Sequence, residues 1–596
     1  MARLSQRGFC IAGLLGAVLG LLALACTTPV VPEAGPPQST TAAPTTAPPT
    51  TTLPTTTLPD GETPPPTITI LVPTSTTIPV VSVPGVTDTT IRVGVIADVE
   101  TGGIADGRSR SAWGGVAAWA EAVNLFGGLG GREIEVVYID TGLFNHEAAI
   151  ERACQGDIFA IVGSDALFDH EGLSQLGGED CPVLDFPAVA NSPQRQSRAE
   201  TFLSNPTPPG VVQVGPLQAL AEISPAGVDA AAMILLDDLS TSIIRGEKEI
   251  EAALSQGYTT VLEPTTQLTS MLCAPIELYD QITTQGVRSL LWPTDGIWLA
   301  NFLQAGDPGD TAAEAEDDGS DGSNADAGNT GEEGSGGGSG ENEDTTSEND
   351  PSDGTGSSES GTDSGTGSQE GTGDTQEQPS PEPSPETPAE TPDISPVNCP
   401  AESEISESDV SDTRERLTLE FTFCDMTCNR ADFSTVLGAT AAESANIYLA
   451  THLLPIEEAQ LNRDLTQYIT TLSFLSRADS RLPSEPDLQG VAAWAAARLF
   501  EEAVRQAIQP EAGNTFLPLT TQAVLEAVAN IDDWDAYGLH APSNPASKTP
   551  TNCFALLKYQ DGNWQRQHPS TAGEWDCAPD NLYTLRITGG LQAAGG

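Results

Sequence analysis

The stretch Ile91-Arg92-Val93-Gly94-Val95-Ile96-Ala97 decides the fold, because its apolar run indicates a short, buried β-strand. Apolar residues then recur at spacings of three and four, which predicts a helix, at Trp113, Val116, Ala120, Val123 and Phe126. Glycines at 127–131 predict the end of this helix, since glycine accepts positive φ at a helix C-terminus. A second strand is predicted over 134–139.

The same alternation of strand and helix continues along the chain. Further strands are predicted over 158–162, 182–184, 231–236, 260–262, 289–292 and 417–423. Helices are predicted around 147–153 and over 488–508. Apolar strands separated by helices predict parallel sheets that are covered on both faces, so the fold class is α/β.

The charge of the chain excludes one class of partner. The 596 residues include 24 Lys and Arg but 84 Asp and Glu, which gives a formal net charge of −60. Nucleic-acid phosphates need Lys and Arg to displace their counterions, so we expect no nucleic-acid binding. The acid is concentrated, since residues 306–400 contain 25 Asp and Glu and neither Lys nor Arg.

Residues 1–25 are typical of an export signal. Arg3 and Arg7 precede an uncharged apolar run at 11–25, which is shorter than the roughly 20 residues of a membrane-spanning helix. Small residues before Cys26 are typical of a bacterial lipobox, in which the cysteine is acylated. We therefore expect lipidation of Cys26 and anchoring at the extracytoplasmic face of the cell membrane. The alternative is an ordinary signal peptide or a short anchor in which the cysteine is incidental.

Two segments have the composition of disordered chain. Residues 26–87 are rich in Thr and Pro, which favours an extended stalk over a packed core. Residues 305–399 form an acidic insert rich in Gly, Ser and Pro, whose low hydrophobicity cannot offset chain entropy. Calcium binding by the insert is an alternative, although it contains no D-x-D-x-D-G loop with a glutamate at position twelve.

Several stretches resemble one protein family. Residues 91–102, followed by Asn-Leu-Phe-Gly-Gly-Leu-Gly-Gly-Arg at 124–132, resemble the opening of the type I periplasmic binding proteins, in their leucine/isoleucine/valine-binding branch. Residues 159–163 and 181–188 resemble the third and fourth strands of that family, and 555–564 resembles its closing hairpin.

The resemblance implies two α/β lobes, joined by three crossovers, with a ligand between them. It places lobe one at 88–212 and 453–548, and lobe two at 213–304, 400–452 and 549–596. Open α/β sheets bind ligands beyond the carboxyl ends of their strands. The insert leaves lobe two from the opposite edge, where it does not block the cleft.

The resemblance also implies a set of ligand-binding residues. They are Ser164, Asp165, Ala166, Val189, Ala190, Asn191, Ser240, Thr241, Asp295 and Asp425. In the family, the loop after the third strand holds a ligand carboxylate at a helix N-terminus. Here Ala166-Leu167-Phe168 replaces the usual Ser/Thr run, and Asp165 would repel a carboxylate. A larger apolar or amide ligand is therefore as compatible as an amino acid, and Asp425 would pair with a ligand amine.

The cysteine count agrees with export. Apart from Cys10 and Cys26, an even number remains, which suggests four disulfides. Cys154–Cys181 and Cys553–Cys577 are the preferred pairs, each within one implied lobe. Three connectivities stay open for the other four, which are Cys273, Cys399, Cys424 and Cys428. The C-x₃-C spacing with five scattered histidines is a poor zinc pattern, so we expect no metal and no cofactor.

The resemblance implies a solute-binding receptor of an ABC importer. The expected partners are a small-molecule ligand and a transporter permease, and the receptor itself is expected to be a monomer. No H-E-x-x-H, G-x-S-x-G or Walker motif occurs, so we expect no enzyme activity. The alternatives are a ligand-sensing or cell-wall scaffold lipoprotein that keeps the fold without transport, and an extracellular hydrolase.

Overall fold

A computed structural model describes residues 83–101, 106–237, 239–259, 261–273, 275–305, 417–430, 432–509 and 517–586. The predicted signal peptide, the lipidation site at Cys26, nearly all of the stalk and the acidic insert lie outside these ranges. The last residues assigned to the stalk are described, and they contact the body. The amide of Gly85 donates to Asp157 Oδ1 at 2.7 Å, and Val86 pairs with Ile91. The stalk prediction therefore ends a few residues too late.

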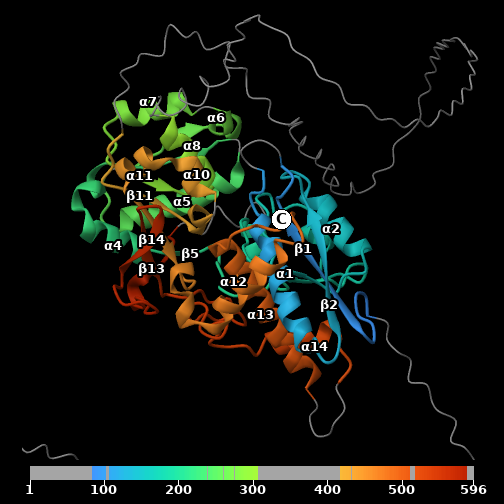
Figure 1. The fold of residues 1–596 in the computed structure, drawn as a ribbon. Helices are drawn as coiled ribbons and strands as arrows, with labels where there is room; N and C mark the ends of the chain where they lie inside the picture. Colours follow the sequence, from blue (N-terminus) through green and yellow to red (C-terminus); the bar gives the residue numbers. More distant parts are fainter. Residues whose placement is uncertain are drawn as a thin grey trace, which may run out of the picture. The chain divides into compact units, whose positions relative to one another are not determined.

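Lobe one, as we use the term below, is built on a four-stranded parallel sheet of order β2-β1-β3-β4. Its strands are β1 (Thr90–Ala97), β2 (Glu133–Asp140), β3 (Ala160–Val162) and β4 (Leu184–Phe186). Its helices are α1 (Arg110–Leu125), α2 (His146–Gln155), α3 (Pro193–Ser197), α12 (Arg463–Leu475), α13 (Leu488–Ile508) and α14 (Thr521–Val528). Figure 1 shows blue α1 beside orange α13, so two distant stretches of sequence build this lobe.

Lobe two is built on a seven-stranded sheet of order β14-β13-β12-β11-β10-β6-β8. Its strands are β6 (Ala231–Met233), β8 (Val261–Leu262), β10 (Ser289–Trp292), β11 (Phe421–Cys424), β12 (Ile447–Thr451), β13 (Ala555–Gln560) and β14 (Asn563–His568). The first five are parallel, and β13 and β14 form the antiparallel hairpin expected near the end of the chain. The single strand predicted over 231–236 is two short strands, because β7 (Leu235–Leu236) leaves the sheet to pair with β9 (Thr265–Thr266).

Helices of lobe two follow its strands in the α/β order predicted from the sequence. They are α4 (Gly215–Ile223), α5 (Ser240–Ser255), α6 (Leu268–Cys273), α7 (Ile276–Thr284), α8 (Gly296–Gln304), α10 (Phe433–Leu437) and α11 (Ala439–Ala445). Alternating strands and helices place the connections that follow parallel strands at one edge of each sheet. The residues of those connections form the site described below.

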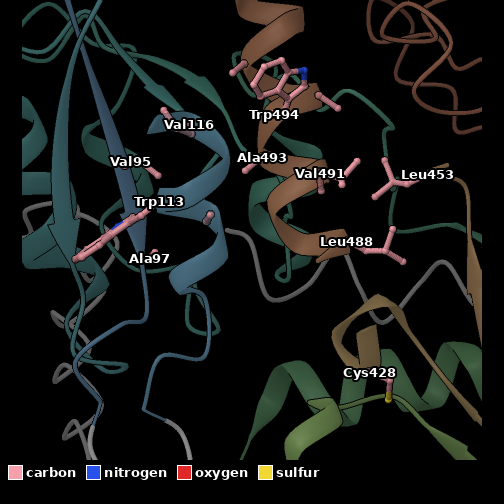
Figure 2. Packing of buried hydrophobic residues seen from close by; sticks show 14 of the residues in the cluster. Val95, Ala97, Trp113, Val116, Cys428, Leu453, Leu488, Val491, Ala493 and Trp494 are labelled. Atoms are coloured by element: carbon pink, nitrogen blue, oxygen red, sulfur yellow. The ribbon is translucent and has the colours of Figure 1, made fainter. Parts of the chain in front are cut away.

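The core of lobe one depends on the close approach of α1 and α13. A Cβ added to Gly115 would lie 2.3 Å from the carbonyl oxygen of Gly490, so only glycine fits there. Figure 2 shows Ala493 of α13 facing α1, with Trp113 and Val116 on the α1 side. All three side chains are buried. This packing explains why both helices are rich in Ala and Gly.

The end of α1 agrees with the prediction from the glycines at 127–131, although the apolar spacing alone continues one residue further. Phe126 continues the helical spacing of the apolar residues, but α1 ends at Leu125 and the Phe126 side chain is 76% exposed. The chain turns at Gly127 and Gly128, both with positive φ, and a Cβ on Gly128 would overlap the Arg132 carbonyl. The turn chemistry therefore takes precedence over the apolar spacing at this helix end.

The described chain passes between the two lobes at three places, and these crossovers are linked to one another. Leu453 of the second crossover pairs with His540 of the third. The Ser543 hydroxyl donates to the carbonyl oxygen of Ser204 in the first crossover at 2.6 Å. Hydrogen bonds of this kind between crossovers give the two lobes one common hinge.

The described cysteines agree with the predicted pairing. The structure contains both preferred pairs, Cys154–Cys181 and Cys553–Cys577. It also joins Cys424 to Cys428, which is one of the three connectivities left open for the other four cysteines. Cys399 and the side chain of Cys273 lie outside the described part of the chain. None of the described helices is both long enough and apolar enough to cross a membrane.

Candidate functional site

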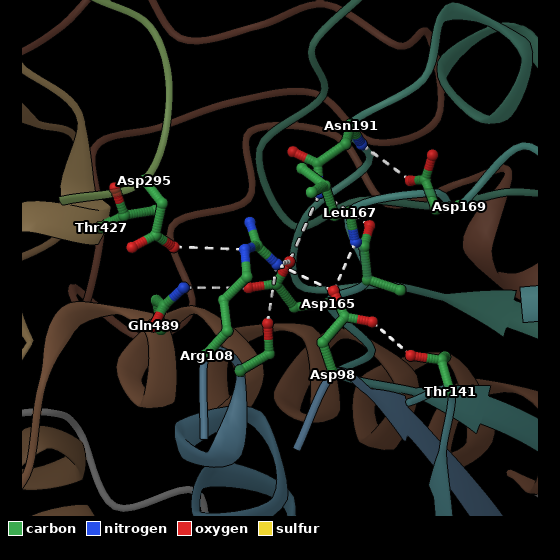
Figure 3. A network of polar contacts seen from close by, with 12 residues as sticks. Asp98, Arg108, Thr141, Asp165, Leu167, Asp169, Asn191, Asp295, Thr427 and Gln489 are labelled. Carbon is green, nitrogen blue, oxygen red and sulfur yellow. Dashed lines mark hydrogen bonds and ion pairs between the residues drawn. The ribbon is translucent and has the colours of Figure 1, made fainter. Parts of the chain in front are cut away.

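A buried arginine lies where the two lobes meet. Arg108 comes from the connection between β1 and α1, and its side chain is only 5% exposed. Its guanidinium lies 3.2 Å from Asp98 Oδ2, 3.6 Å from Asp165 Oδ1 and 3.2 Å from Asp295 Oδ2. Asp98 follows β1, Asp165 follows β3, and Asp295 caps α8 in lobe two. Figure 3 shows Arg108 between these three carboxyl groups.

Hydrogen bonds fix the carboxyl groups of this cluster. Asp98 accepts from the Thr141 hydroxyl and from the Leu167 amide, the latter at 2.7 Å. Asp165 accepts from Gln489 Nε2 at 3.1 Å. Because every carboxyl group already has partners within the protein, the cluster is part of the folded structure and does not depend on a ligand.

Burial changes the acid–base properties of the cluster. Burial raises the pKa of Asp98 to about 6, although Arg108 and two hydrogen bonds act in the opposite direction. Burial likewise raises the pKa of Asp295, against the effect of Arg430 and Arg108. Burial opposes the charge of Arg108, but the surrounding aspartates outweigh it and raise the pKa of the guanidinium. An anionic ligand would therefore contact carboxyl groups here, because the charge of Arg108 is already paired with the aspartates.

Other contacts join the lobes beside this cluster. Arg430 of lobe two donates to the Arg108 carbonyl oxygen at 3.2 Å and lies 3.9 Å from Asp295 Oδ1. Asn429 Oδ1 accepts from the amide of Leu488, the first residue of α13, at 3.1 Å. The chain therefore uses its own charged and polar groups to hold the lobes together at this end of the cleft.

A second buried arginine positions the loops of lobe one. Arg195 donates to Asp185 Oδ1 and to Ser164 Oγ, both at 2.6 Å. Asp169, whose carboxylate lies 3.7 Å from Arg195, accepts from the amide of Asn191 at 2.7 Å. Arg195 is fully buried. It therefore acts as the support that sets the positions of the loops after β3 and β4.

Two cavities lie between the lobes. The smaller one, of about 60 Å³, is next to Arg108. The larger one, of about 310 Å³, extends from the loop after β4 toward the hinge. About half of its lining residues are apolar, among them Ala188, Val189, Ala190, Leu203, Val211, Ile244, Met426, Ala450, Leu453, Ala492 and Ala495, and the rest are polar or charged. A concave cavity that combines apolar walls with polar groups is the usual form of a small-molecule site.

Most of the predicted ligand residues line these cavities. Both cavities are lined by Val189, Asn191, Thr241 and Asp425, the larger one also by Ala190, and the smaller one also by Asp165 and Asp295. Ser164 and Ala166 are fully buried and lie behind the walls. The Ser164 hydroxyl is already bonded to Arg195, and the Ala166 carbonyl accepts from Asn191 Nδ2 at 2.8 Å. Ser240 is the first residue of α5, and its side chain lies outside the described part of the structure.

Asp425, predicted to pair with a ligand amine, has a partner within the protein. Its Oδ2 lies 2.8 Å from Arg245 Nη1, and Arg245 also pairs with Glu249 at 3.0 Å. Among the described residues, no group of three or more His, Cys, Asp or Glu side chains is arranged to hold a metal ion.

Sequence reasoning missed several residues of the site. They are Arg108, Gln196, Ser204, Arg245, Lys248, His452 and His540. Arg245 and Lys248 carry a signal that was available, since cations are scarce and both fall on one helical face with Thr241. The two histidines carry no local signal, because they belong to crossovers that only the fold brings together.

A serine–histidine contact lies at the hinge wall of the larger cavity. Ser204 Oγ lies 2.7 Å from His540 Nε2, and His540 Nδ1 lies 2.7 Å from the Ala541 carbonyl oxygen. The carbonyl requires a proton on Nδ1, so Nε2 accepts from the Ser204 hydroxyl. Burial lowers the pKa of His540 to about 4. Trp534 Nε1 also donates to Ser204 Oγ at 2.9 Å. This hydrogen bond occupies a lone pair of the hydroxyl oxygen, which the serine would need in order to act as a nucleophile. We interpret this set as a link between crossovers.

The two sheets, their strand orders and the three crossovers define the two-lobed fold of the type I periplasmic binding proteins. The fold and the resemblance predicted from the sequence are confirmed at this level. No protein-family model matches the chain, and no curated protein matches it by sequence.

The solved structures that the chain resembles include substrate-binding proteins of ABC transporters. A leucine-binding protein of Thermotoga maritima has 11% identity and a TM-score of 0.48, with 82% of this chain and 99% of that chain covered. A fatty acid ABC transporter substrate-binding protein of Thermomonospora curvata has 15% identity and a TM-score of 0.47, with 83% and 95% covered. A solute-binding protein of R. palustris in complex with benzoate has 11% identity and a TM-score of 0.47, with 80% and 95% covered.

Proposed function

We propose that this chain is a solute-binding receptor whose ligand occupies the larger cavity between the lobes. The observation that supports this function is the cavity itself. It measures about 310 Å³ and is lined by residues of both lobes and of all three crossovers. A ligand that contacts both lobes stabilises the state in which they are closed over it, because it gains contacts that the open state lacks.

The proposed ligand is a small organic molecule with an apolar body. The apolar walls favour such a body, while the smaller cavity offers little room beside Arg108. Asp165 and its neighbours disfavour the carboxylate position that the family resemblance implied. The proposal therefore moves the ligand from the loop after β3 toward the hinge.

The importer role extends this proposal. We propose that the receptor is anchored through a lipid on Cys26, acts as a monomer outside the cytoplasm, and delivers its ligand to a transporter permease. The export signal and the Cys26 motif support the location. Uptake of the identified ligand by cells that express or lack the chain would test the delivery step.

A thermal-shift screen tests the binding proposal. The mature chain would be heated with amino acids, amides, organic acids, amines and sugars. A compound that binds only the folded chain adds about 2.7 kcal/mol of stability at one hundred times its Kd. We expect a saturable rise in melting temperature with one class. Val189→Trp, which fills the cavity wall, should abolish the rise, and Ile223→Trp, at an exposed position of lobe two, should not. A flat response to every class would contradict the proposal.

One observation favours a second function, a ligand-sensing or wall-scaffold lipoprotein without transport. Arg108, Asp295 and Arg430 already join the lobes with protein groups. A receptor that cycles between open and closed states must break these contacts each time, whereas a scaffold need not. Ligand binding without cellular uptake would favour this alternative.

A further inference from the structure

One short segment of lobe two both lines the cavities and contacts lobe one. Residues 424–430, which we call the contact segment, begin at the end of β11 and contain a 3₁₀ turn over Met426–Asn429. Asp425 and Met426 line both cavities between the lobes. Asn429 accepts from the Leu488 amide of lobe one, and the neighbouring arginine donates to the loop before α1. The cavity wall and the contact between the lobes therefore lie within one turn of the chain.

A disulfide between Cys424 and Cys428 closes this turn into a ring, and both side chains are buried. Inside the ring, Asp425 Oδ1 accepts from the Thr427 amide at 2.9 Å and from its hydroxyl at 2.5 Å. Figure 2 shows Cys428 of lobe two beneath Leu488, the first residue of α13. The ring is therefore next to the contact that Asn429 makes with that helix.

The ring also packs against the start of α8. The Thr427 hydroxyl accepts from the amide of Gly296 at 2.9 Å. A Cβ added to Gly296 would lie 2.6 Å from the Cα of Cys428, so only glycine allows this close approach. Asp295, which caps α8, belongs to the buried ion pair between the lobes. The ring therefore supports the lobe-two side of that ion pair as well as Asn429.

The small size of the ring indicates what the disulfide does. The two cysteines are separated by only 4 positions, and a disulfide that closes so short a loop adds little to the stability of the whole fold. A single 3₁₀ turn is weak by itself, because its hydrogen-bond geometry is poor. One backbone bond, from the Cys428 amide to the Asp425 carbonyl oxygen at 3.2 Å, spans the ring. The disulfide therefore acts mainly on the shape of the contact segment.

We propose that the Cys424–Cys428 disulfide determines how firmly the two lobes are joined. With the bond in place, the contact segment presents Asn429 and Arg430 to lobe one. Without it the segment relaxes, and the lobes separate more readily at this end of the cleft. The disulfide is thus a positioning element that acts through these two residues. This inference concerns the contact between the lobes and depends neither on a ligand nor on transport.

Hydrogen–deuterium exchange of the mature chain tests the proposal, with the Leu488 amide as the reporter. This amide donates to Asn429 Oδ1, so its exchange rate measures the contact between the lobes. Both cysteines would be replaced, as Cys424→Ala/Cys428→Ala, because a buried serine hydroxyl would need a partner of its own. We expect exchange at Leu488 to become about twofold to tenfold faster, the range that corresponds to the loss of one hydrogen bond. The melting temperature should fall only slightly.

The matched control is Cys553→Ala/Cys577→Ala. This pair belongs to the same lobe, spans a sequence separation of 24 and lines neither cavity. Its loss should lower the melting temperature more than the loss of the short ring does, and it should leave exchange at Leu488 unchanged. The comparison separates a positioning role from a general loss of stability.

Three results would overturn the proposal. The first is unchanged exchange at Leu488 in a folded Cys424→Ala/Cys428→Ala chain. The second is an equal rise in the control variant, which would mean that the loss of any disulfide loosens the contact. The third is a failure of Cys424→Ala/Cys428→Ala to fold, since the disulfide would then be required by the fold as a whole.

Discussion

Arg108 Nε of lobe one lies 3.2 Å from Asp295 Oδ2 of lobe two, and both side chains are almost fully buried. A buried ion pair that joins two lobes affects both stability and opening, because each opening must return the charges to water. The carbonyl oxygen of Arg108 also accepts a hydrogen bond from Arg430 of lobe two. This contact is therefore the first place to test how the lobes are held.

Asp295→Asn should weaken the contact between the lobes. Asparagine can still accept from the Ile297 amide as the helix cap, but it no longer pairs with Arg108. We expect a loss of up to about 3–5 kcal/mol in the free energy of unfolding. Hydrogen–deuterium exchange should accelerate around Asn429 and Leu488, which lie on opposite sides of the same contact region.

The control for this variant is Glu135→Gln, which removes an exposed ion pair with Arg92 inside lobe one. Exposed pairs are worth about 0–1 kcal/mol, so little change is expected. Equal effects of the two variants would show that the contact between Arg108 and Asp295 does not hold the lobes.

Asp487 should make stability depend on pH. This residue caps α13, accepts from Gly490 and Ser111, and is buried, which raises its pKa from 3.8 to about 6. The folded state therefore holds the proton more tightly than the unfolded state. The resulting stability is present below pH 4 and is lost as the pH rises through about 6, and it amounts to about 3 kcal/mol.

Asp487→Asn removes this titration. We would measure the free energy of unfolding by denaturant at pH 4.5 and pH 7.5. The native chain should lose stability relative to the variant as the pH rises. Asp479→Asn is the control, because hydrogen bonds from Arg481 lower the pKa of Asp479 from 3.8, so this side chain stays ionised at both pH values and the effect of the substitution should be nearly the same at both. A stability difference that is the same at both pH values would refute the assignment to Asp487.

Arg195→Met should destabilise lobe one. The substitution leaves the buried Asp185 and Asp169 carboxylates without their cation, which costs about 3–5 kcal/mol. Because Arg195 also holds Ser164, ligand affinity should fall together with the melting temperature. Arg477→Met, at an exposed position of lobe one, is the matched control. Unchanged affinity in a folded Arg195→Met variant would show that the loops do not depend on this support.

Each disulfide should stabilise the folded chain by an amount that increases with the length of the loop it closes. Replacing Cys154 and Cys181 by serine opens a link with a sequence separation of 27, and the chain-entropy model predicts a loss of about 3–4 kcal/mol. The Cys424–Cys428 link spans a separation of only 4, so its removal should cost less. Denaturant unfolding of the two double variants gives the order, and a larger effect at Cys424–Cys428 would contradict it.

The fold could be predicted from the sequence because its signals are local. The apolar run at 91–97 falls within β1, and the predicted helix over 488–508 coincides with α13. The glycines at 127–131 correctly predicted the end of α1, and only the apolar spacing extended one residue too far, to Phe126.

The site could be predicted only in part, since its chemistry depends on distant residues. The loops after β3 and β4 were found through the family resemblance, and residues such as Val189 and Asn191 line both cavities. Arg108 was missed because its importance comes from Asp295, which lies far along the chain. Ser204 and His540 are separated by 336 positions, and no sequence spacing relates them.

The most direct test of the ligand position is hydrogen–deuterium exchange of the mature chain with the compound that gives the largest thermal shift. We expect slower exchange in the loop at 188–196 of lobe one and in α5 of lobe two, on opposite walls of the larger cavity. Protection confined to one lobe, or to segments away from this cavity, would contradict the claim that the ligand binds between the lobes.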